Sequence, residues 1–435
     1  MKLVRSIREL LSNKMVFKSI HVLGLRIAGM LLFFALTLVL TNNFDAELVG
    51  QYDFSRALLI FLGGICVFGM HQSVIYYSGY LKSRNSLPYL SRLYKKMVVI
   101  VFAIALVFFV VTVGIPPEFF DGLFDKPVSR LVTYSVFALF FYGITLLNID
   151  VFRAINKIYV SEFYRNILRY ALFFGAVVYL YFSGNPQYLV EVFLLNFVVL
   201  ALLSTAFLFF YFSKMAPQAT SEEISFKQII KRSGPMAISA VTYLLMQSVD
   251  VILLSKYSTF DRVAFYAVAI KLTTVLSLVL ASVNTVYAPS FSEWYNLNDT
   301  NSLRAGIKRS TRLIFLFTFP AIVIVLLFSE MILGFFGPDY IQAKWALIVL
   351  LIGQAINAFC GSVGTYMNMT GKQVVFQRIL VTAFVLNVVL NLVLIPIHDI
   401  LGAAIATTIS TVFWNIVTTA YIYRKDRMIT FLTLK

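Results

Sequence analysis

Three basic side chains interrupt long apolar runs of this sequence, at Arg26, Arg56 and Lys271. A cation in the hydrocarbon core of a membrane is costly unless it reaches the headgroups, pairs with an anion or faces a water-filled cavity. Lys271 lies nine residues after Arg262, which places it roughly 13 Å deep if the run is a helix. Fixed positive charges in a low-dielectric passage offset the desolvation of phosphate or carboxylate, so these three residues predict a binding site for an anionic substrate.

The three cations differ in how strongly they indicate a cavity. Arg26 lies six residues after Ile20, roughly 9 Å deep, where its side chain could equally bend back to the cytoplasmic headgroups or line a cavity. Arg56 lies at the outer end of its run, where an interfacial position is the simpler interpretation. In the repeat alignment described below, Arg56 falls opposite Ile270, next to Lys271, and this gives a cavity role equal weight.

Acidic and amide side chains in the apolar runs have several interpretations. Asp250 lies near the outer end of its run; it is a counter-ion for Lys271, a coupling site for H⁺ or Na⁺, or an ordinary helix-end carboxylate, and the last is the commonest situation. Asn387 and Asn391 share one helix face, and interhelical hydrogen bonding explains them without a ligand. Scattered His and Cys residues predict no metal site, no cofactor and no catalysis, so the chain is not expected to be an enzyme.

The elements that must position these side chains are membrane-spanning helices. Hydrophobic residues make up 60% of the chain and charged residues 13%, with a mean hydropathy of +0.85. Apolar runs of about 20 residues match the hydrocarbon thickness, and they are too long for barrel strands. They predict an all-α integral membrane protein with twelve spans, near 19–40, 55–79, 97–115, 131–150, 166–183, 189–212, 235–254, 263–288, 312–333, 343–368, 374–396 and 400–422.

A polar stretch divides these spans into two equal groups. It predicts an N-terminal six-helix bundle over 1–213, a cytoplasmic linker over 214–234 and a C-terminal six-helix bundle over 235–435. Residues 38–52 align without gaps on residues 252–266, with three identities. An even number of helices in each half makes the repeats parallel, related by a pseudo-two-fold axis along the membrane normal, with the substrate path between the bundles.

The distribution of Lys and Arg predicts the orientation in the membrane. One set of alternating loops and termini carries 28 of these residues and the other set carries 5. By the positive-inside rule both termini are cytoplasmic. The formal charge of +16 would suggest nucleic acid in a soluble protein, but here the cations lie in short loops, so no nucleic-acid partner is expected.

Four stretches of the sequence match a known family pattern: Val49, Gly50 and Tyr52; Asp250 and VAFYAVAIKL at 263–272; FFGPDYIQAKWALIVL at 335–350; and ILGAAIATTIS at 400–410. With these residues the chain resembles the Wzx-type polysaccharide (O-antigen) flippases of the multidrug/oligosaccharidyl-lipid/polysaccharide exporter superfamily over nearly its whole length. Departures from the family pattern are Ala264, where the motif usually has Gly, and Lys271, where relatives carry Arg. Lys cannot form the two parallel hydrogen bonds that Arg makes to phosphate.

The resemblance implies a flippase that moves an undecaprenyl-pyrophosphate-linked oligosaccharide, a repeat unit of O-antigen or capsule, to the outer leaflet of the bacterial inner membrane by alternating access. Basic residues on the first, second and eighth helices line the cavity in such proteins, which implies a substrate-binding role for Arg26, Arg56 and Lys271. Implied partners are the lipid-linked anionic oligosaccharide, membrane lipids, a coupling ion (H⁺ or Na⁺), a polysaccharide polymerase and chain-length proteins.

Three other functions remain to be weighed against this one. A cation-coupled multidrug exporter of the same superfamily would carry acidic cavity residues, whereas the embedded charge predicted here is net basic. A membrane glycosyltransferase or polymerase would show a large external loop or clustered carboxylates, and the outer loops are short. A peptidoglycan-precursor flippase usually carries two further helices.

Overall fold

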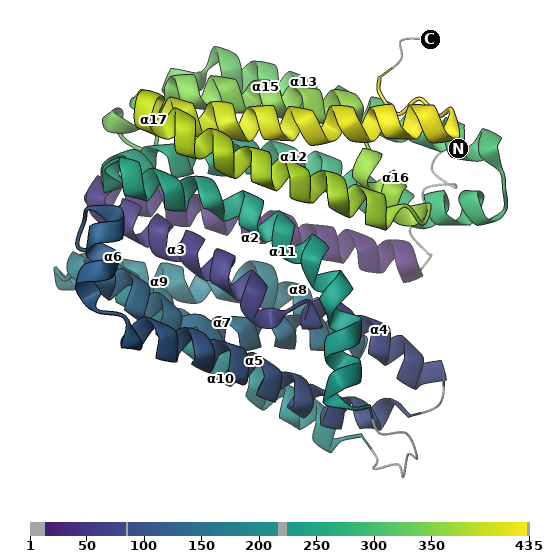
Figure 1. Cartoon of the computed structure of the whole chain (residues 1–435), viewed down its shortest axis with the longest axis horizontal. Helices are drawn as coiled ribbons and strands as arrows, with labels where there is room; N and C mark the ends of the chain where they lie inside the picture. The colour runs from purple at the N-terminus through teal and green to yellow at the C-terminus, as the bar shows by residue number, and fades with distance from the viewer. Residues whose placement is uncertain (1–13, 84–85, 216–223, 433–435) are drawn as a thin grey trace. The chain divides into compact units, whose positions relative to one another are not determined.

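The computed structural model describes residues 14–83, 86–215 and 224–432, and these residues are almost entirely helical (Figure 1). Nine helical segments in this part of the chain are long and apolar enough to cross a membrane. The protein is therefore a multi-pass membrane protein. Its helices of five or more residues are α2 (Lys14–Asn43), α3 (Ala46–Val67), α4 (Met70–Ser83), α5 (Leu90–Gly114), α6 (Pro117–Phe124), α7 (Ser129–Ala154), α8 (Ile158–Glu162), the π-helix η2 (Phe163–Leu168), α9 (Arg169–Ser183), α10 (Leu189–Ser213), α11 (Phe226–Tyr257), α12 (Phe260–Asn296), α13 (Thr300–Leu327), α14 (Ser329–Gly334), η4 (Pro338–Ala343), α15 (Lys344–Cys360), α16 (Val363–Met369) and α17 (Gln373–Asp426).

The expected count of twelve spans stays a prediction, because three regions differ from the simple pattern. Neither α3 nor α11 is among the nine segments. The expected span 55–79 is interrupted where Phe68 and Gly69 take φ values of 46° and 69°. The expected span 343–368 breaks at Gly361 (φ 74°), where a Cβ would lie 2.2 Å from the Oγ1 atom of Thr311.

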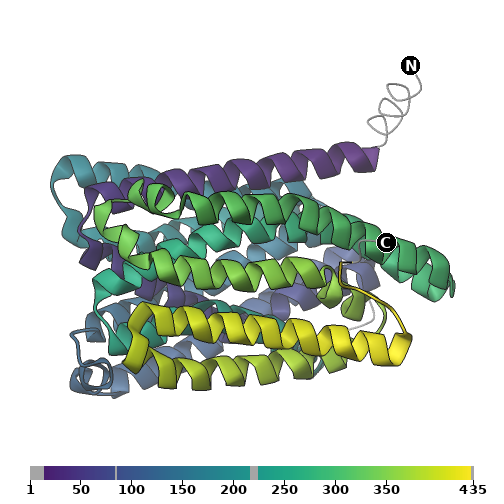
Figure 2. The same cartoon turned by 90° about the horizontal axis from the view of Figure 1, so that it is seen from above.

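The last two expected spans form one element, α17, with a sharp break. Asp399 takes φ 52° and ψ −132°, which is not helical, so two limbs meet there. The limbs lie side by side (Figure 2). Gly402 makes this approach close, because a Cβ at that position would lie 2.1 Å from the backbone oxygen of Leu394.

The chain divides into two compact units whose boundaries differ from the expected ones. The first contains residues 1–43, 58–122 and 127–241, and the second contains 44–57, 123–126 and 242–435. The start of α3 packs in the second unit: a Cβ on Gly50 would lie 1.9 Å from the carbonyl oxygen of Phe260, and the rings of Phe54 and Phe260 are 6.0 Å apart. Arg56 therefore belongs to the same unit as Lys271.

The expected linker 214–234 is only partly a linker. Its residues 216–223 lie outside the described part of the chain, but α11 already begins at Phe226. A capping box starts this helix: the backbone N–H of Ser225 donates to the Oε1 atom of Gln228 at 2.8 Å, and the backbone N–H of Gln228 donates to the hydroxyl of Ser225 at 3.3 Å. The Ser-x-x-Gln spacing is visible in the sequence.

We expect the substitution Gly50→Ala to destabilise the protein by about 1–3 kcal/mol, because the added methyl group overlaps the backbone of Phe260. The matched control is Gly175→Ala in α9, where a Cβ meets nothing within 4 Å. There the lower backbone entropy of alanine in the unfolded chain should leave stability equal or improved by roughly 0.5–1 kcal/mol. Thermal unfolding of the full-length chain in detergent measures both, and equal shifts would contradict the close approach.

Candidate functional site

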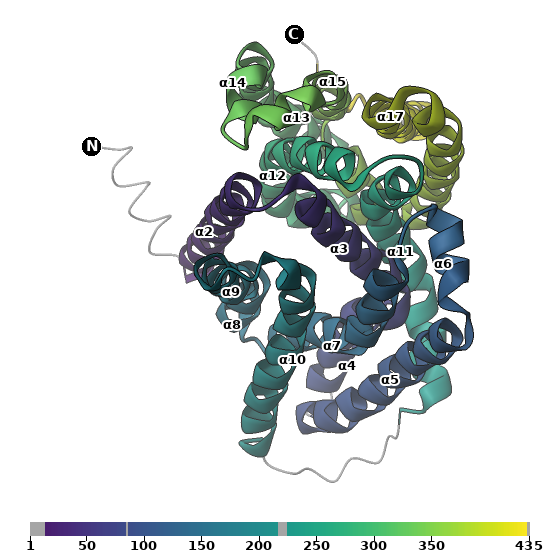
Figure 3. The same cartoon turned by 90° about the vertical axis from the view of Figure 1, so that its left-hand side faces the viewer.

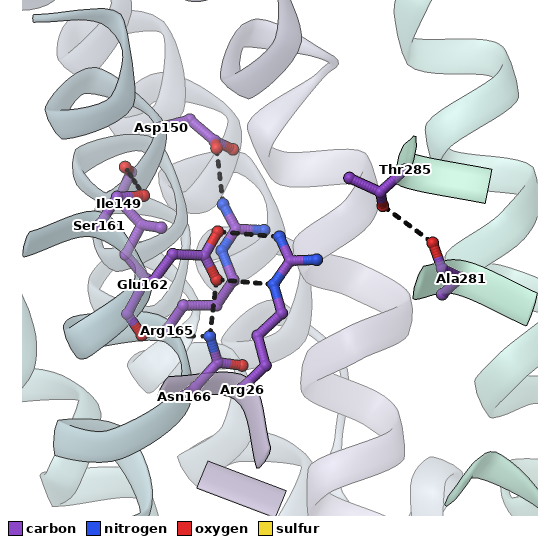
Figure 4. A network of polar contacts seen from close by, with 9 residues as sticks. All are labelled: Arg26, Ile149, Asp150, Ser161, Glu162, Arg165, Asn166, Ala281 and Thr285. Carbon is purple, nitrogen blue, oxygen red and sulfur yellow. Dashed lines mark hydrogen bonds and ion pairs between the residues drawn. The ribbon is translucent and has the colours of Figure 1, made fainter. Parts of the chain in front are cut away.

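Arg26 forms a two-point ion pair with Glu162 inside the first unit (Figure 4). Its Nε and Nη2 atoms donate to Oε2 and Oε1 of Glu162 at 3.0 and 2.9 Å. The amide of Asn166 also donates to Oε2 at 2.9 Å. The Glu162 side chain is only 5% exposed and that of Arg26 is 38% exposed. The carboxylate is therefore buried and fully paired, while part of the guanidinium stays accessible.

Close packing of α2 against α8 and η2 positions this pair (Figure 3). Gly29, one turn after Arg26, lies against Asn166, one turn after Glu162: a Cβ on Gly29 would lie 2.2 Å from the backbone oxygen of Asn166. Small residues at a helix contact let two backbones approach in this way. Asn166 belongs to the π-helix η2, which follows α8 directly, and π-helical turns are frequent at functional sites.

A second ion pair lies beside the first, between Arg165 and Asp150 (Figure 4). The Nη2 atom of Arg165 donates to Oδ1 of Asp150 at 2.6 Å, and the arginine side chain is 41% exposed. One turn further on, the guanidinium of Arg169 lies 5.8 Å from the ring centre of Tyr142 and 5.2 Å from that of Phe197. The first unit thus holds several cations close together, each stabilised by anions or aromatic faces.

The second unit holds Arg56 and Lys271 around one buried carboxylate. The Nζ atom of Lys271 donates to Oδ2 of Asp53 at 2.9 Å, and Arg56 approaches the same carboxylate at 3.9 Å. Lys271 also lies 5.7 Å from the ring centre of Tyr52. The side chains of Lys271 and Asp53 are 4% and 1% exposed, whereas that of Arg56 is 28% exposed. The repeat alignment had indicated that Arg56 and Lys271 occupy related positions, and here they share an anion.

These contacts change two expectations about the site. Lys271 was expected to face a hydrated passage, but in this conformation its ammonium is buried against Asp53, because a buried cation is stable only when it is paired. Asp250 was considered as its counter-ion, and that role belongs to Asp53 instead. Sequence reasoning missed Asp53, Asp150 and Glu162. The available signal was the three-residue spacing of Asp53 and Arg56, which places them on one helix face.

Asp250 lies in a separate buried cluster of the second unit. Its Oδ1 atom accepts from the amide of Asn391 at 2.7 Å, and its Oδ2 atom accepts from the hydroxyls of Tyr266, at 3.2 Å, and Thr407. The residue is 2% exposed. Within the described ranges no Lys, Arg or His forms an ion pair with this carboxylate. A buried carboxyl group without a cation carries either a proton or a bound ion, because an isolated charge is too costly.

The donor set around Asp250 suits a small cation. The side-chain oxygens of Asn387 and Asn391 are buried and have no hydrogen-bond donor, so they add two free acceptors to the carboxylate and the two hydroxyls. Oxygen-rich sites of this kind bind hard cations. The residues lie on α11, α12 and both limbs of α17, so the break at Asp399 is needed to bring Asn391 and Thr407 to the same carboxylate.

Comparison with known proteins identifies the family. The model of the family described as "Polysaccharide biosynthesis protein" matches residues 16–294, more than half of the chain. The chain belongs to this family. A second model, MatE, matches residues 235–393. The resemblance that the sequence motifs indicated is thus confirmed, and the family comprises transporters rather than enzymes.

Two similar relatives carry functional names. A protein of Haloferax volcanii named as a low-salt glycan biosynthesis flippase is 26% identical over 185 residues, which cover 42% of this chain and 39% of that protein. A protein of Shigella flexneri named as an O-antigen transporter is 28% identical over 190 residues, which cover 43% of this chain and 45% of that protein. The matched segments span less than half the length of either relative.

Solved structures support the fold over a longer part of the chain. The lipid II flippase MurJ, in an inward closed conformation, superposes with a TM-score of 0.69 at 14% identity over 91% of this chain and 87% of that one. An inward-facing transporter of the multidrug resistance MATE family superposes with a TM-score of 0.68 at 13% identity over 90% and 93%. At these identities the likeness shows a common helical membrane fold and no more.

We expect Glu162→Gln to destabilise the protein by about 1–3 kcal/mol, because it removes one charge from a pair whose carboxylate is buried while the partly exposed arginine can still reach solvent. Thermal unfolding of the purified chain measures the loss. The matched control is Glu191→Gln, which removes the partner of Arg130, an arginine with a 62% exposed side chain. An exposed pair contributes about 0–1 kcal/mol. Equal losses in the two variants would contradict the structural role of Glu162.

Proposed function

We propose that the protein is a flippase for lipid-linked oligosaccharides, and that its substrate is an anionic oligosaccharide on undecaprenyl pyrophosphate. The carrying observation is membership of the polysaccharide biosynthesis family. The relatives named as a glycan biosynthesis flippase and an O-antigen transporter favour the same substrate class. The proposal places the protein in the bacterial inner membrane with both termini cytoplasmic and with a polymerase and chain-length proteins downstream.

In this proposal Arg26, Arg56 and Lys271 bind the pyrophosphate by exchange of anions. Arg26 pairs with Glu162, and Arg56 and Lys271 share the carboxylate of Asp53, so each cation lies within 4 Å of an anion of its own unit when the substrate is absent. Arg26 and Arg56 keep part of the guanidinium accessible, and a guanidinium can donate two parallel hydrogen bonds to the oxygens of a phosphate group. Lys271 becomes available only when Asp53 moves or is shared. The carboxylates thereby stabilise the cations when no substrate is bound. An incoming anion must bind the cations more strongly than these carboxylates do.

The proposed coupling site is Asp250. A proton or Na⁺ on this carboxylate would neutralise the only unpaired buried charge in its cluster, and the free oxygens of Asn387 and Asn391 would complete the coordination of a metal ion. Protonation or ion binding changes which hydrogen bonds Asp250 can accept from the hydroxyls of Tyr266 and Thr407. Such a change can bias the packing of α11 against α17.

The decisive experiment reconstitutes the full-length chain in liposomes that contain a fluorescent oligosaccharide on polyprenyl pyrophosphate. Transport is expected to expose the label to a quencher outside the liposome. The combined variant Arg26→Gln, Arg56→Gln and Lys271→Gln serves as the inactive control after its insertion is confirmed. Label exchange equal to that of empty liposomes would reject the flippase, and equal activity of the combined variant would reject the three cations as the site.

A cation-coupled multidrug exporter is the second candidate, and one observation favours it. The carboxylates of Asp53, Asp150 and Glu162 pair with the embedded cations, and the buried carboxyl group of Asp250 adds a fourth acidic residue, so the net basic character is weaker than the sequence predicts. Acidic residues of this kind suit cationic drugs. The same liposomes, loaded with a fluorescent organic cation, separate the two functions, since uptake of the cation without movement of the lipid-linked sugar would support the exporter.

A further inference from the structure

A basic cavity lies at one end of the second unit, where α11 ends and α12 begins. Its volume is about 520 Å³, and its lining includes Lys126, Lys256 and Arg262 together with one carboxylate, that of Asp125. Tyr257, Ser258 and Thr259 supply the connecting wall. None of these residues belongs to the proposed transport site or to the Asp250 cluster.

Two of the three cations, Lys126 and Arg262, are held in place by contacts within the fold and still have N–H donors for a ligand. Lys126 donates to the backbone oxygens of Ser255 and Ser258 at the end of α11, where carbonyl groups of a helix favour a positive charge. Burial lowers the pKa of Lys126, because desolvation disfavours the ammonium form. Arg262 is oriented by Asp399 at 3.4 Å from its Nε atom. A guanidinium has five N–H donors, so most of those on Arg262 remain for a ligand.

Membrane orientation does not explain these cations. Lys126 precedes α7, Lys256 lies at the end of α11 and Arg262 lies at the start of α12. All three belong to the set of loops expected on the outer side of the membrane, which carries only five Lys and Arg residues. Three of those five, Lys126, Lys256 and Arg262, line this one cavity. Positive charges on that side oppose the positive-inside signal. Their convergence is therefore better explained by an anion than by topology.

The first turn of α12 adds a further positive contribution. Thr259 caps this 37-residue helix by accepting from the backbone N–H of Arg262, and its neighbours Ser258 and Tyr257 also line the cavity. The N-terminal end of a long helix carries a partial positive charge. Three side-chain cations and this helix end outweigh two carboxylates, that of Asp125 in the lining and that of Asp399 beside Arg262, so the cavity is electropositive.

We propose that this cavity is a binding site for a phosphoryl anion, a phosphate or pyrophosphate group carried either by a lipid headgroup or by a free molecule. Lys256 and Arg262 contact the anion, and Lys126 supports it from the wall of the cavity. The site is separate from the transport site, so the inference goes beyond the proposed function and does not depend on it. Only binding is assigned here, and no chemical step is involved.

The test uses the full-length chain in nanodiscs of zwitterionic phosphatidylcholine and inorganic pyrophosphate as the probe. Titration calorimetry should give saturable binding, and the double variant Lys256→Gln/Arg262→Gln should weaken it by about tenfold or more, as expected for the loss of two charge-assisted contacts. Arg130→Gln is the matched control, because Arg130 belongs to the same set of loops but pairs with Glu191 in the first unit. It should bind pyrophosphate like the unmodified chain.

A second arm identifies the source of the anion. If a lipid headgroup is the ligand, nanodiscs that contain a polyprenyl diphosphate should weaken pyrophosphate binding to the unmodified chain; if the ligand is free, this lipid should have no effect. Both results are compatible with a phosphoryl site. The inference is overturned if the unmodified chain shows no saturable binding, or if the double variant, with unchanged thermal stability, binds as tightly as the control. The double variant tests this cavity alone, because it leaves Arg26, Arg56 and Lys271 of the proposed transport site unchanged.

Discussion

Replacement of Lys271 by methionine is expected to destabilise the protein by about 3–5 kcal/mol, because it leaves the carboxylate of Asp53 buried without its nearest cation. Arg56, at 3.9 Å, is too distant to replace the lost contact fully. The loss is measured by thermal unfolding of the full-length chain in detergent. Lys344→Met is the control, since Lys344 pairs with the exposed Glu330 and should lose about 0–1 kcal/mol.

The double variant Lys271→Met/Asp53→Leu separates stability from function. Removal of both charges should restore most of the lost stability, because two apolar side chains can replace a buried ion pair at little cost. Transport of the lipid-linked substrate should stay lost if Lys271 binds the anion. A fully active double variant would show that the pair is only structural, and a Lys271→Met protein as stable as the unmodified chain would contradict the buried ion pair itself.

Substitution of Asp250 by asparagine is expected to make transport independent of the ion gradient. The amide keeps the shape of the side chain but can neither take up a proton nor neutralise Na⁺. A loss of about 1.4 kcal/mol in cation binding already reduces occupancy tenfold under subsaturating conditions, so the gradient-driven rate should fall by about tenfold or more. Transport in liposomes with and without an imposed H⁺ or Na⁺ gradient measures the effect and also tells which ion is used.

The control for Asp250 is another carboxylate of the second unit, Asp299. It caps α13 by accepting from the backbone N–H of Ser302 at 3.0 Å, and asparagine caps helices equally well. Asp299→Asn should therefore retain both stability and the response to the gradient. A gradient response in Asp250→Asn equal to that of this control would remove Asp250 from the coupling mechanism.

Hydropathy predicts the helical membrane fold because each span must satisfy its own backbone within the bilayer. The same reasoning locates Arg26, Arg56 and Lys271, since a cation in an apolar run stands out. It does not reveal their partners. Asp53 and Glu162 both fall between expected spans, whereas the helices extend past the apolar runs, with α3 from Ala46 and α8 to Glu162. Pairing of residues 136 and 218 positions apart needs a tertiary fold.

The length of the apolar runs does not predict the breaks within the helices. Phe68 and Asp399 adopt positive φ without being glycine, and nothing in the local hydropathy marks either position. Asp399 matters for the site, because the two limbs of α17 carry Asn391 and Thr407 to opposite oxygens of Asp250. The sequence could suggest that Asn387 and Asn391 share a helix face, but not that this face meets Asp250.

The π-helix at Phe163–Leu168 sets the direction in which the side chains after it point, relative to those before it. Such a turn is an α-helix that has accepted one additional residue. Loss of a single residue there would restore α-helical winding and rotate everything that follows by about 100° relative to what precedes it. Glu162 would keep its ion pair with Arg26. Arg169 would lose its contacts with the rings of Tyr142 and Phe197. One inserted residue thus sets the rotation about the helix axis between Glu162, which binds Arg26, and Arg169. A homologue that lacks this residue must arrange its cations differently.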